Sequence, residues 1–225
     1  MRHLHHFVLS PFCRKVRLVL GEKKLAFDLV AERPWERRPE FLALNPVGQV
    51  PVMVEESGTV IADSGAIAEY FEEIHPEPSL MPSRPPERAE VRRLIAFFDQ
   101  LFFTEVSGVL LREKVLKRFG WSRDGATAPD IAAIRAALDG LRKDLAYVGD
   151  LAEKRGWLVG TLSLADFAAA AHISCVDYLG DIAWETAPAA REWYARVKSR
   201  PCFRPLLADH LPGMPPPRHY ANLDF

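Results

Sequence analysis

The residues best placed for chemistry near the start of the chain are a serine and a cysteine, in Ser10-Pro-Phe-Cys13. The Ser10 hydroxyl, at the end of a short apolar run, could donate a hydrogen bond to a bound thiolate and stabilise it. Ser10 could equally cap the following helix, beside a proline that favours the first turn. Cys13 would lie in that turn, where the helix dipole and neighbouring cations could lower its pKa. The alternative for Cys13 is a half-buried, unreactive thiol.

A second feature that could bind a ligand is the turn Asn45-Pro-Val-Gly-Gln-Val-Pro51. Its internal proline and glycine indicate a turn. Pro51 follows the β-branched Val50 and opens an apolar run, which makes it a candidate cis proline. Such a turn would leave the backbone N–H and C=O of Val50 free to pair with an extended, peptide-like ligand.

The pair Asp63-Ser64 opens a helical pattern. The first N–H groups of a helix have no partner within the helix and suit a carboxylate. The pair therefore predicts either a carboxylate site or only a helix cap.

Alternating strand and helix patterns must position these residues. The expected order up to residue 74 is βαβαββα, which is typical of a thioredoxin-like domain. The strands are expected at 3–9, 25–30, 51–55 and 59–61, and the helices at 12–24, up to about 44, and from 63 to 74. In the first helix an apolar stripe faces the core, and we expect three cations to face solvent: Arg14, Lys15 and Arg17.

The second half of the chain is expected to be an all-α bundle. Five prolines between His75 and Pro86 indicate a linker. Helices are expected at 87–118, 131–155, 187–198 and 202–208, with a core helix that begins at the capping box of Ser163 and Asp166. We therefore expect a first domain at 1–78, a helical domain at 87–208 and a proline-rich tail at 209–225.

Composition excludes several classes of function. The chain has 225 residues, 26% of them charged, with a net charge of −1. It lacks the basic excess of a nucleic-acid binder, so no nucleic-acid partner is expected. No run of 18 apolar residues and no signal peptide is seen, which predicts a cytoplasmic protein without direct membrane insertion. Three scattered cysteines favour a reducing compartment, and the seven histidines lack metal-ligand spacing, so no metal site is expected.

The three blocks that contain Ser10, Val50 and Asp63 resemble, in order and spacing, the N-terminal domain of cytosolic glutathione S-transferases. The resemblance implies a glutathione S-transferase fold over residues 1–208. It also implies a candidate glutathione site: a catalytic serine position, a backbone that holds the cysteinyl part and a helix start that holds the γ-glutamyl end. Those positions are Ser10, Val50, Pro51, Asp63 and Ser64. Cys13 stands where the family has no catalytic residue.

Two further features are not needed by a transferase. Trp35 lies in a loop rich in arginine and glutamate, among them Arg37 and Arg38, which is the composition of an interface hot spot. It either anchors a partner or leans against the second domain. The tail ends in aromatic, apolar and acidic residues rather than polar ones, so it either docks on its own fold or presents side chains to another protein. The side chains in question are Tyr220, Leu223, Asp224 and Phe225.

With this loop and tail, the whole chain resembles a bacterial branch of the superfamily that works in cell division and binds the tubulin homologue FtsZ. The resemblance implies a cytoplasmic homodimer that binds FtsZ filaments at the division site, regulates cytokinesis and uses neither cofactor nor glutathione chemistry. The alternative is a glutathione S-transferase that conjugates glutathione, its substrate, to small electrophiles through Ser10. A third possibility is a glutathione-dependent reductase or isomerase that uses Cys13.

Overall fold

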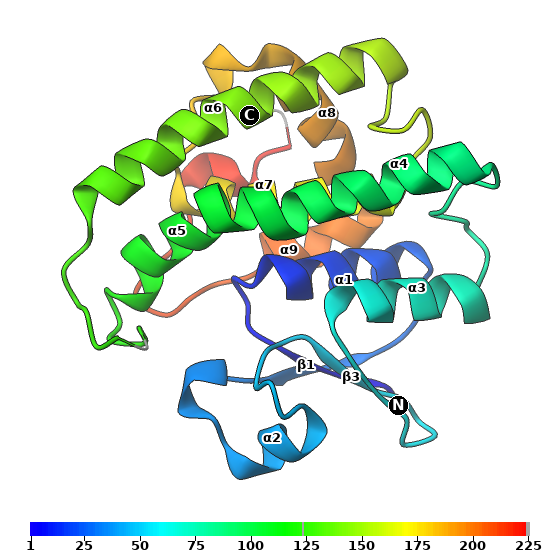
Figure 1. The fold of residues 1–225 in the computed structure, drawn as a ribbon, viewed down its shortest axis with the longest axis horizontal. Coiled ribbons are helices and arrows are strands. Elements are labelled where there is room, and N and C mark those ends of the chain that lie inside the picture. The colour runs from blue at the N-terminus through cyan, green and yellow to red at the C-terminus, as the bar shows by residue number, and fades with distance from the viewer. Residues whose placement is uncertain (123, 224–225) are drawn as a thin grey trace.

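The computed structural model describes residues 1–122 and 124–223. The N-terminal part is a four-stranded sheet with helices on both faces (Figure 1). Its elements in chain order are β1 (His3–His6), α1 (Pro11–Glu22), β2 (Asp28–Ala31), η1 (Pro34–Glu36), α2 (Pro39–Leu44), β3 (Val52–Val54), β4 (Val60–Ala62) and α3 (Ser64–Ile74). The predicted order βαβαββα is confirmed, with every strand end within three residues of the expected position.

The sheet has the strand order β2-β1-β3-β4. β1 pairs with β2 in parallel, with Leu4 opposite Leu29, and with β3 antiparallel, with Leu4 opposite Met53. β3 and β4 form the antiparallel hairpin that was predicted. Figure 1 shows α1 and α3 on one face of the sheet and α2 on the other. Ser10 follows the C-terminal end of β1, and Pro51 precedes the N-terminal end of β3. Because the two strands are antiparallel, both residues lie at the side of the sheet that adjoins the helical domain.

The remainder of the described chain is helical, as predicted. Its elements are α4 (Pro85–Ala96), η2 (Phe97–Ser107), α5 (Gly108–Leu111), η3 (Arg112–Leu116), α6 (Ile131–Arg155), α7 (Leu164–Leu179), η4 (Trp184–Thr186), α8 (Pro188–Lys198), η5 (Pro201–Phe203), α9 (Arg204–Leu207) and η6 (Arg218–Ala221). Asp130 caps α6, and Ser163 and Asp166 form the predicted capping box at the start of α7.

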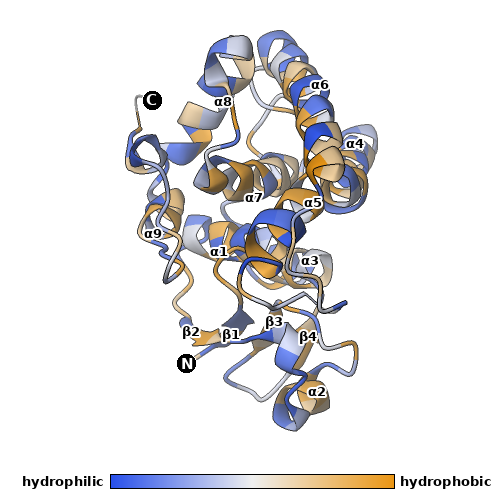
Figure 2. Cartoon of the chain, turned by 90° about the vertical axis from the view of Figure 1, so that its left-hand side faces the viewer, coloured by the Kyte–Doolittle hydropathy of each residue, from blue (hydrophilic) through white to orange (hydrophobic). Residues whose placement is uncertain are grey.

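The centre of the molecule is α7, which is surrounded by other helices and coloured as hydrophobic along most of its length in Figure 2. All but one of its residues are buried, including four consecutive alanines from Ala168 to Ala171. Small side chains allow neighbouring helices to approach closely, and α7 packs against α1, α4 and η2. The core is thus continuous from the sheet domain into the helical domain.

The segments from α4 to η3 form one helical rod, Pro85–Leu116. Within the described residues it is the one helix that is long and apolar enough to cross a membrane by length and composition, with a most apolar window of mean hydropathy 1.6. A core helix passes the same test, and a stripe of this rod packs against α6 and α7. Only 39% of that window is buried, so part of its apolar surface is left open.

The expectation that Arg14, Lys15 and Arg17 face solvent is wrong. Their exposed fractions are 0%, 1% and 4%. Each has a carboxylate partner from the helical half of the chain: Asp99 pairs with Lys15, and Asp209 pairs with both arginines. The cations are buried because α1 lies between the sheet and α7, and a buried charge requires such a partner.

Candidate functional site

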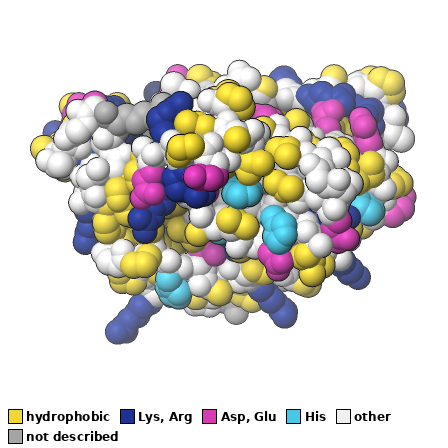
Figure 3. Space-filling model, turned by 90° about the horizontal axis from the view of Figure 1, so that it is seen from below, with side chains coloured by type: hydrophobic (Ala, Val, Ile, Leu, Met, Phe, Trp, Pro, Cys, Tyr) yellow, Lys and Arg dark blue, Asp and Glu magenta, His cyan; other side chains and the backbone are white. Residues whose placement is uncertain are grey.

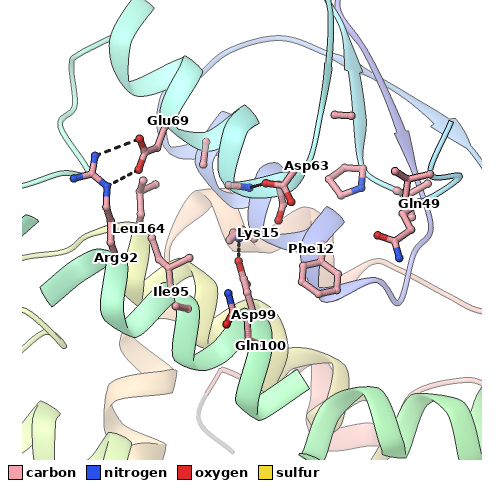
Figure 4. A pocket seen from close by; sticks show the side chains of 18 of the residues that line it. Phe12, Lys15, Gln49, Asp63, Glu69, Arg92, Ile95, Asp99, Gln100 and Leu164 are labelled. Carbon is pink, nitrogen blue, oxygen red and sulfur yellow. Dashed lines mark hydrogen bonds and ion pairs between the residues drawn. The ribbon is translucent and has the colours of Figure 1, made fainter. Parts of the chain in front are cut away.

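A groove of about 550 Å³ lies between the sheet domain and the rod (Figure 4). Four of the five residues predicted for glutathione line it: Val50, Pro51, Asp63 and Ser64. The peptide bond between Val50 and Pro51 is cis, as predicted. Among the described residues, no backbone hydrogen bond occupies the N–H or C=O of Val50, so both remain available to a ligand.

Asp63 is both a helix cap and a strained residue. Its Oδ1 accepts hydrogen bonds from the N–H groups of Gly65 and Ala66, at 2.7 and 3.0 Å. Its φ of 79° is in the left-handed region, which a non-glycine residue rarely adopts and which often marks a ligand site. The two readings of Asp63-Ser64 that the sequence left open therefore coexist: the aspartate caps α3, and Ser64 still lines the groove.

The charges that line the groove are paired with one another. Lys15 pairs with Asp99, and Arg92 pairs with Glu69 through two hydrogen bonds of 2.8 and 3.2 Å (Figure 4). With the carboxylate of Asp63, the lining carries two cations and three carboxylates. A ligand that brings further negative charge finds no unpaired cation in this lining.

Asp99 continues inward as a buried polar chain. Its Oδ1 lies 3.2 Å from Nε2 of His172, whose Nδ1 lies 2.8 Å from the hydroxyl of Ser107. Burial lowers the pKa of His172, so the ring is neutral and can donate through Nε2 while it accepts at Nδ1. Burial opposes ionisation of Asp99, but His172 and Lys15 outweigh it and hold its pKa below the ordinary value. At neutral pH the carboxylate of Asp99 is thus ionised and remains paired with Lys15.

Ser10 does not line the same cavity as Asp63 and Ser64. It lines a second, more apolar cavity of about 560 Å³, which adjoins the groove because both are bounded by Phe12, Gln49 and Val50. The hydroxyl oxygen of Ser10 accepts a hydrogen bond from the backbone N–H of Cys13 at 3.3 Å, and the residue is 9% exposed. Its capping role is therefore present, and the residue also lines the second cavity.

Cys13 is fully buried rather than half-buried. Burial raises the pKa of its thiol to about 12, although the hydrogen bond to Ser10 acts in the opposite direction. The expected influence of neighbouring cations does not prevail, because Arg14 and Lys15 are turned to their own carboxylates. Cys13 is thus a packed core residue in this fold and carries no thiolate at neutral pH.

Trp35 leans against the helical domain, one of the two possibilities that the sequence left open. Its ring stacks on that of Trp121, with centroids 4.5 Å apart and an angle of 13°, and Trp121 stacks in turn on Phe119 at 4.6 Å. Phe7 meets Trp35 edge to face at 5.2 Å. We call these four rings, Phe7, Trp35, Phe119 and Trp121, the aromatic stack. Each ring is only partly buried, so the stack also forms part of the surface.

The two arginines beside Trp35 differ in their availability. Arg38 is held by Glu32 through a hydrogen bond of 2.6 Å. Arg37 is exposed and has no hydrogen bond or ion pair with any residue in the ranges 1–122 and 124–223. Its Nη1 lies 3.1 Å from where a Cβ would stand at Gly48, a residue that lines the apolar cavity.

The tail docks on its own chain at several points. The hydroxyl of Tyr178 accepts a hydrogen bond from the N–H of Leu211 and donates one to the carbonyl of Met214, at 2.8 and 2.7 Å. Tyr220 is fully buried, so the prediction that its ring contacts a partner is incompatible with this position. Leu223 is 36% exposed, and Asp224 and Phe225 lie outside the described residues.

Sequence reasoning missed the partners of the predicted residues. Phe119-Gly120-Trp121 places two large aromatic side chains at the end of the rod, beside a loop of polar and small residues. The signal that singled out Trp35, an aromatic ring without a local apolar shell, applies equally to Trp121. Asp99 and His172 carry no such signal, because each lies within a helical pattern.

Residues 4–79 match the family described as "Glutathione S-transferase, N-terminal domain". The FtsZ-localized protein A of Caulobacter vibrioides is 51% identical over 228 residues, which cover 100% of this chain and 98% of the relative. Among solved structures, FzlA from C. crescentus has a TM-score of 0.94 at 51% identity and covers 100% of this chain and 99% of its own. A glutathione S-transferase from Rhodospirillum rubrum F11 has a TM-score of 0.95, also at 51% identity, with both chains fully covered. The chain belongs to the glutathione S-transferase superfamily and is similar along its whole length to FtsZ-localized protein A.

Proposed function

We propose that this protein is a cell-division protein of the glutathione S-transferase fold, which binds FtsZ filaments as a homodimer in the cytoplasm at the division site, regulates cytokinesis and performs no glutathione chemistry. The observation that carries this proposal is the 51% identity with FtsZ-localized protein A along the whole chain. The matched region spans the whole chain and so includes the loop of Trp35 and the tail.

The charges of the groove support a function without glutathione. Glutathione carries two carboxylates and one ammonium group, whereas the groove lining carries three carboxylates and two cations that are already paired. A charge-assisted hydrogen bond to a glutathione carboxylate would require Lys15 or Arg92 to leave its partner. If Lys15 left, Asp99, whose side chain is 17% exposed, would lose the cation that compensates its largely desolvated charge, which is costly.

The residues proposed to bind the partner are Trp35, Arg37 and Arg38 in one loop and Leu223 in the tail, together with Asp224 and Phe225, which lie outside the described residues. Trp35 is partly exposed and is held rigidly by its stacking on Trp121. A side chain held in this way loses little conformational entropy on binding, which suits a binding hot spot. On the face shown in Figure 3, cations and acids are interspersed and neither gathers into a continuous patch. Binding through a local hot spot therefore suits this protein better than attraction by a single-sign field.

A homodimer is supported by the apolar surface that the rod leaves open. Only 39% of its most apolar window is buried, and Leu101 in η2 is 47% exposed. A second copy would cover such a surface, and two copies of a weak site on one filament would gain avidity without new contacts. We propose this contact rather than membrane insertion, because other residues of the same rod, such as Phe98 and Phe102, are core residues of the protein.

The rival function is a glutathione S-transferase that uses Ser10. One observation favours it: the groove assembles Val50, cis Pro51, Asp63 and Ser64 around one cavity, with the Val50 backbone unoccupied. This arrangement suits a peptide-like ligand.

Co-sedimentation with polymerised FtsZ tests the proposal. Wild-type protein should pellet with filaments, and Trp35→Ala and Asp224→Lys should each abolish this binding while the dimer persists and the melting temperature stays within a few degrees of wild type. Trp157→Ala is the matched control, because Trp157 is also half-buried but contacts Arg196 instead of the stack. Calorimetry with millimolar glutathione tests the rival. Saturable heat that Ser64→Ala weakens, together with filament binding unaffected by Trp35→Ala, would overturn the proposal in favour of the transferase.

A further inference from the structure

The apolar cavity beside Ser10 has a wall that belongs to the proposed partner surface. Trp35 lines it together with Trp121, and the rod supplies the opposite wall through Val115 and Leu116. Three rings of the aromatic stack, Phe7, Trp35 and Trp121, thus line the cavity, and each is also partly exposed. A partner that contacts Trp35 from outside meets the opening of a cavity of about 560 Å³.

The described residues of the cavity offer no unpaired charge to an occupant. Its ionisable lining residues in the described part of the chain are Arg112 and Asp124, which form an ion pair with each other. The rest of the wall is dominated by aromatic and aliphatic side chains, so the chemistry of the cavity selects an apolar group.

The rim differs from the interior, because among the described residues it includes a cation without a partner, Arg37. Arg37 lines a shallow hollow with Trp35 and Trp121, and its guanidinium lies against Gly48 at the edge of the apolar cavity. Every other arginine of this loop is paired: Arg33 with Glu36 and Arg38 with Glu32. An exposed guanidinium beside an apolar opening favours a carboxylate next to an apolar side chain.

We propose that this cavity is the receptor for a segment of FtsZ, an inference that rests on the proposed function. The segment inserts one aliphatic or aromatic side chain between Trp35 and Leu116 and places a neighbouring carboxylate on Arg37. The site is continuous with the Trp35 surface, and the unpaired cation at its rim supplies the charge complementarity. In this arrangement the fold uses an interdomain cavity to bind a partner segment, and Trp121 acts as a positioning residue that holds Trp35 as the wall.

Two pairs of variants test the site by quantitative co-sedimentation with FtsZ filaments. Arg37→Glu should weaken binding about tenfold, since it opposes the carboxylate, whereas Arg33→Glu in the same loop should change it less than twofold. Leu116→Trp fills the cavity and should also weaken binding about tenfold. Ile131→Trp adds the same bulk at a site that is 53% exposed and should not. Melting temperatures within a few degrees of wild type are required of all four variants.

The outcomes separate this inference from the proposed function. If Trp35→Ala abolishes binding while Arg37→Glu and Leu116→Trp bind as wild type, the cavity is not the receptor and the proposed function stands. If Trp35→Ala also binds as wild type, the proposed function fails.

A second measurement identifies the occupant of the cavity. The anionic dye 1-anilinonaphthalene-8-sulfonate, whose aromatic rings bind apolar sites, is bound to the wild-type protein, and filaments are then added. Displacement of the dye by FtsZ, absent in Leu116→Trp, supports the receptor. Dye that stays bound while the protein co-sediments indicates a cavity for small apolar molecules and overturns the inference.

Discussion

The buried guanidinium of Arg14 donates a hydrogen bond of 2.9 Å to the hydroxyl of Tyr220, 206 residues further along the chain. The same hydroxyl donates to the carbonyl of Leu206 at 3.1 Å, and Arg14 also donates to the carbonyl of Val8 and the hydroxyl of Ser174. One side chain of α1 therefore joins the loop before Ser10, the core helix and the tail. The tail that was predicted to present residues to a partner is fixed by this contact up to Tyr220.

Removing the Tyr220 hydroxyl should destabilise the protein without creating a cavity. Tyr220→Phe leaves the Leu206 carbonyl and one donor of Arg14 without their buried partner, which costs about 1–2 kcal/mol. Tyr220→Ala also removes a fully buried ring and should cost about 3–5 kcal/mol. Urea unfolding measures both. Leu223→Ala is the control, because that side chain is 36% exposed and its loss should stay within about 0.5 kcal/mol. Equal stability of Tyr220→Phe and wild type would refute the role of the hydroxyl.

The stacking of Trp35 on Trp121 should appear as an energetic coupling between the two domains. A double-mutant cycle with Trp35→Ala and Trp121→Ala should give a coupling free energy of about 0.5–1.5 kcal/mol in urea unfolding. The control cycle pairs Trp35→Ala with Trp157→Ala, which is in contact with Arg196 instead. Its effects should add to within about 0.5 kcal/mol. Additive effects in the first cycle would show that the stack carries no coupling.

Features encoded by local sequence patterns were predictable. The thioredoxin-like order, α6 at Ile131–Arg155 and the capping box at Ser163 follow from periodicity and caps, which depend on neighbours in the chain. The candidate groove followed from resemblance, and the cis bond before Pro51 from a turn pattern. None of these needs a contact between distant residues.

What the sequence could not indicate depends on distant partners. Lys15 and Arg17 looked like a solvated face because their acids, Asp99 and Asp209, are 84 and 192 residues away. The burial of Cys13 likewise depends on α7, which packs on α1 only in the folded chain. For the same reason the sequence could indicate that Trp35 is unusual, but not that Trp121 is its stacking partner.

None of the three cysteines should react in the native protein. Burial raises the pKa of the Cys13 and Cys202 thiols to about 12 and that of Cys175 to about 11. At pH 8 the thiolate fraction of each is then on the order of one in a thousand or less. Iodoacetamide followed by mass spectrometry should label no cysteine in buffer and all three in urea. Rapid labelling of Cys13 in buffer would instead restore the reductase or isomerase hypothesis.

His6 should make the stability of the protein depend on pH. The imidazole is buried and its Nδ1 has no hydrogen-bond partner in the described structure. Burial is the main cause that lowers its pKa to about 4; the charge of Arg17 adds to this effect and that of Asp209 opposes it. Between pH 6.5 and about 4 the unfolded chain therefore binds a proton that the folded protein does not.

The free energy of unfolding should fall as the pH drops through that window, by at most about 1.4 kcal/mol per pH unit from this group, and the contribution should level off below pH 4. Above pH 6.5 both states are neutral at His6 and the contribution of the group is constant. His6→Asn should flatten the dependence in urea unfolding between pH 4 and 7, whereas His3→Asn, an exposed histidine of the same strand, should retain the wild-type slope. A slope that His6→Asn leaves unchanged would refute this prediction. It would mean that the folded protein protonates His6 without cost despite its burial beside two arginines.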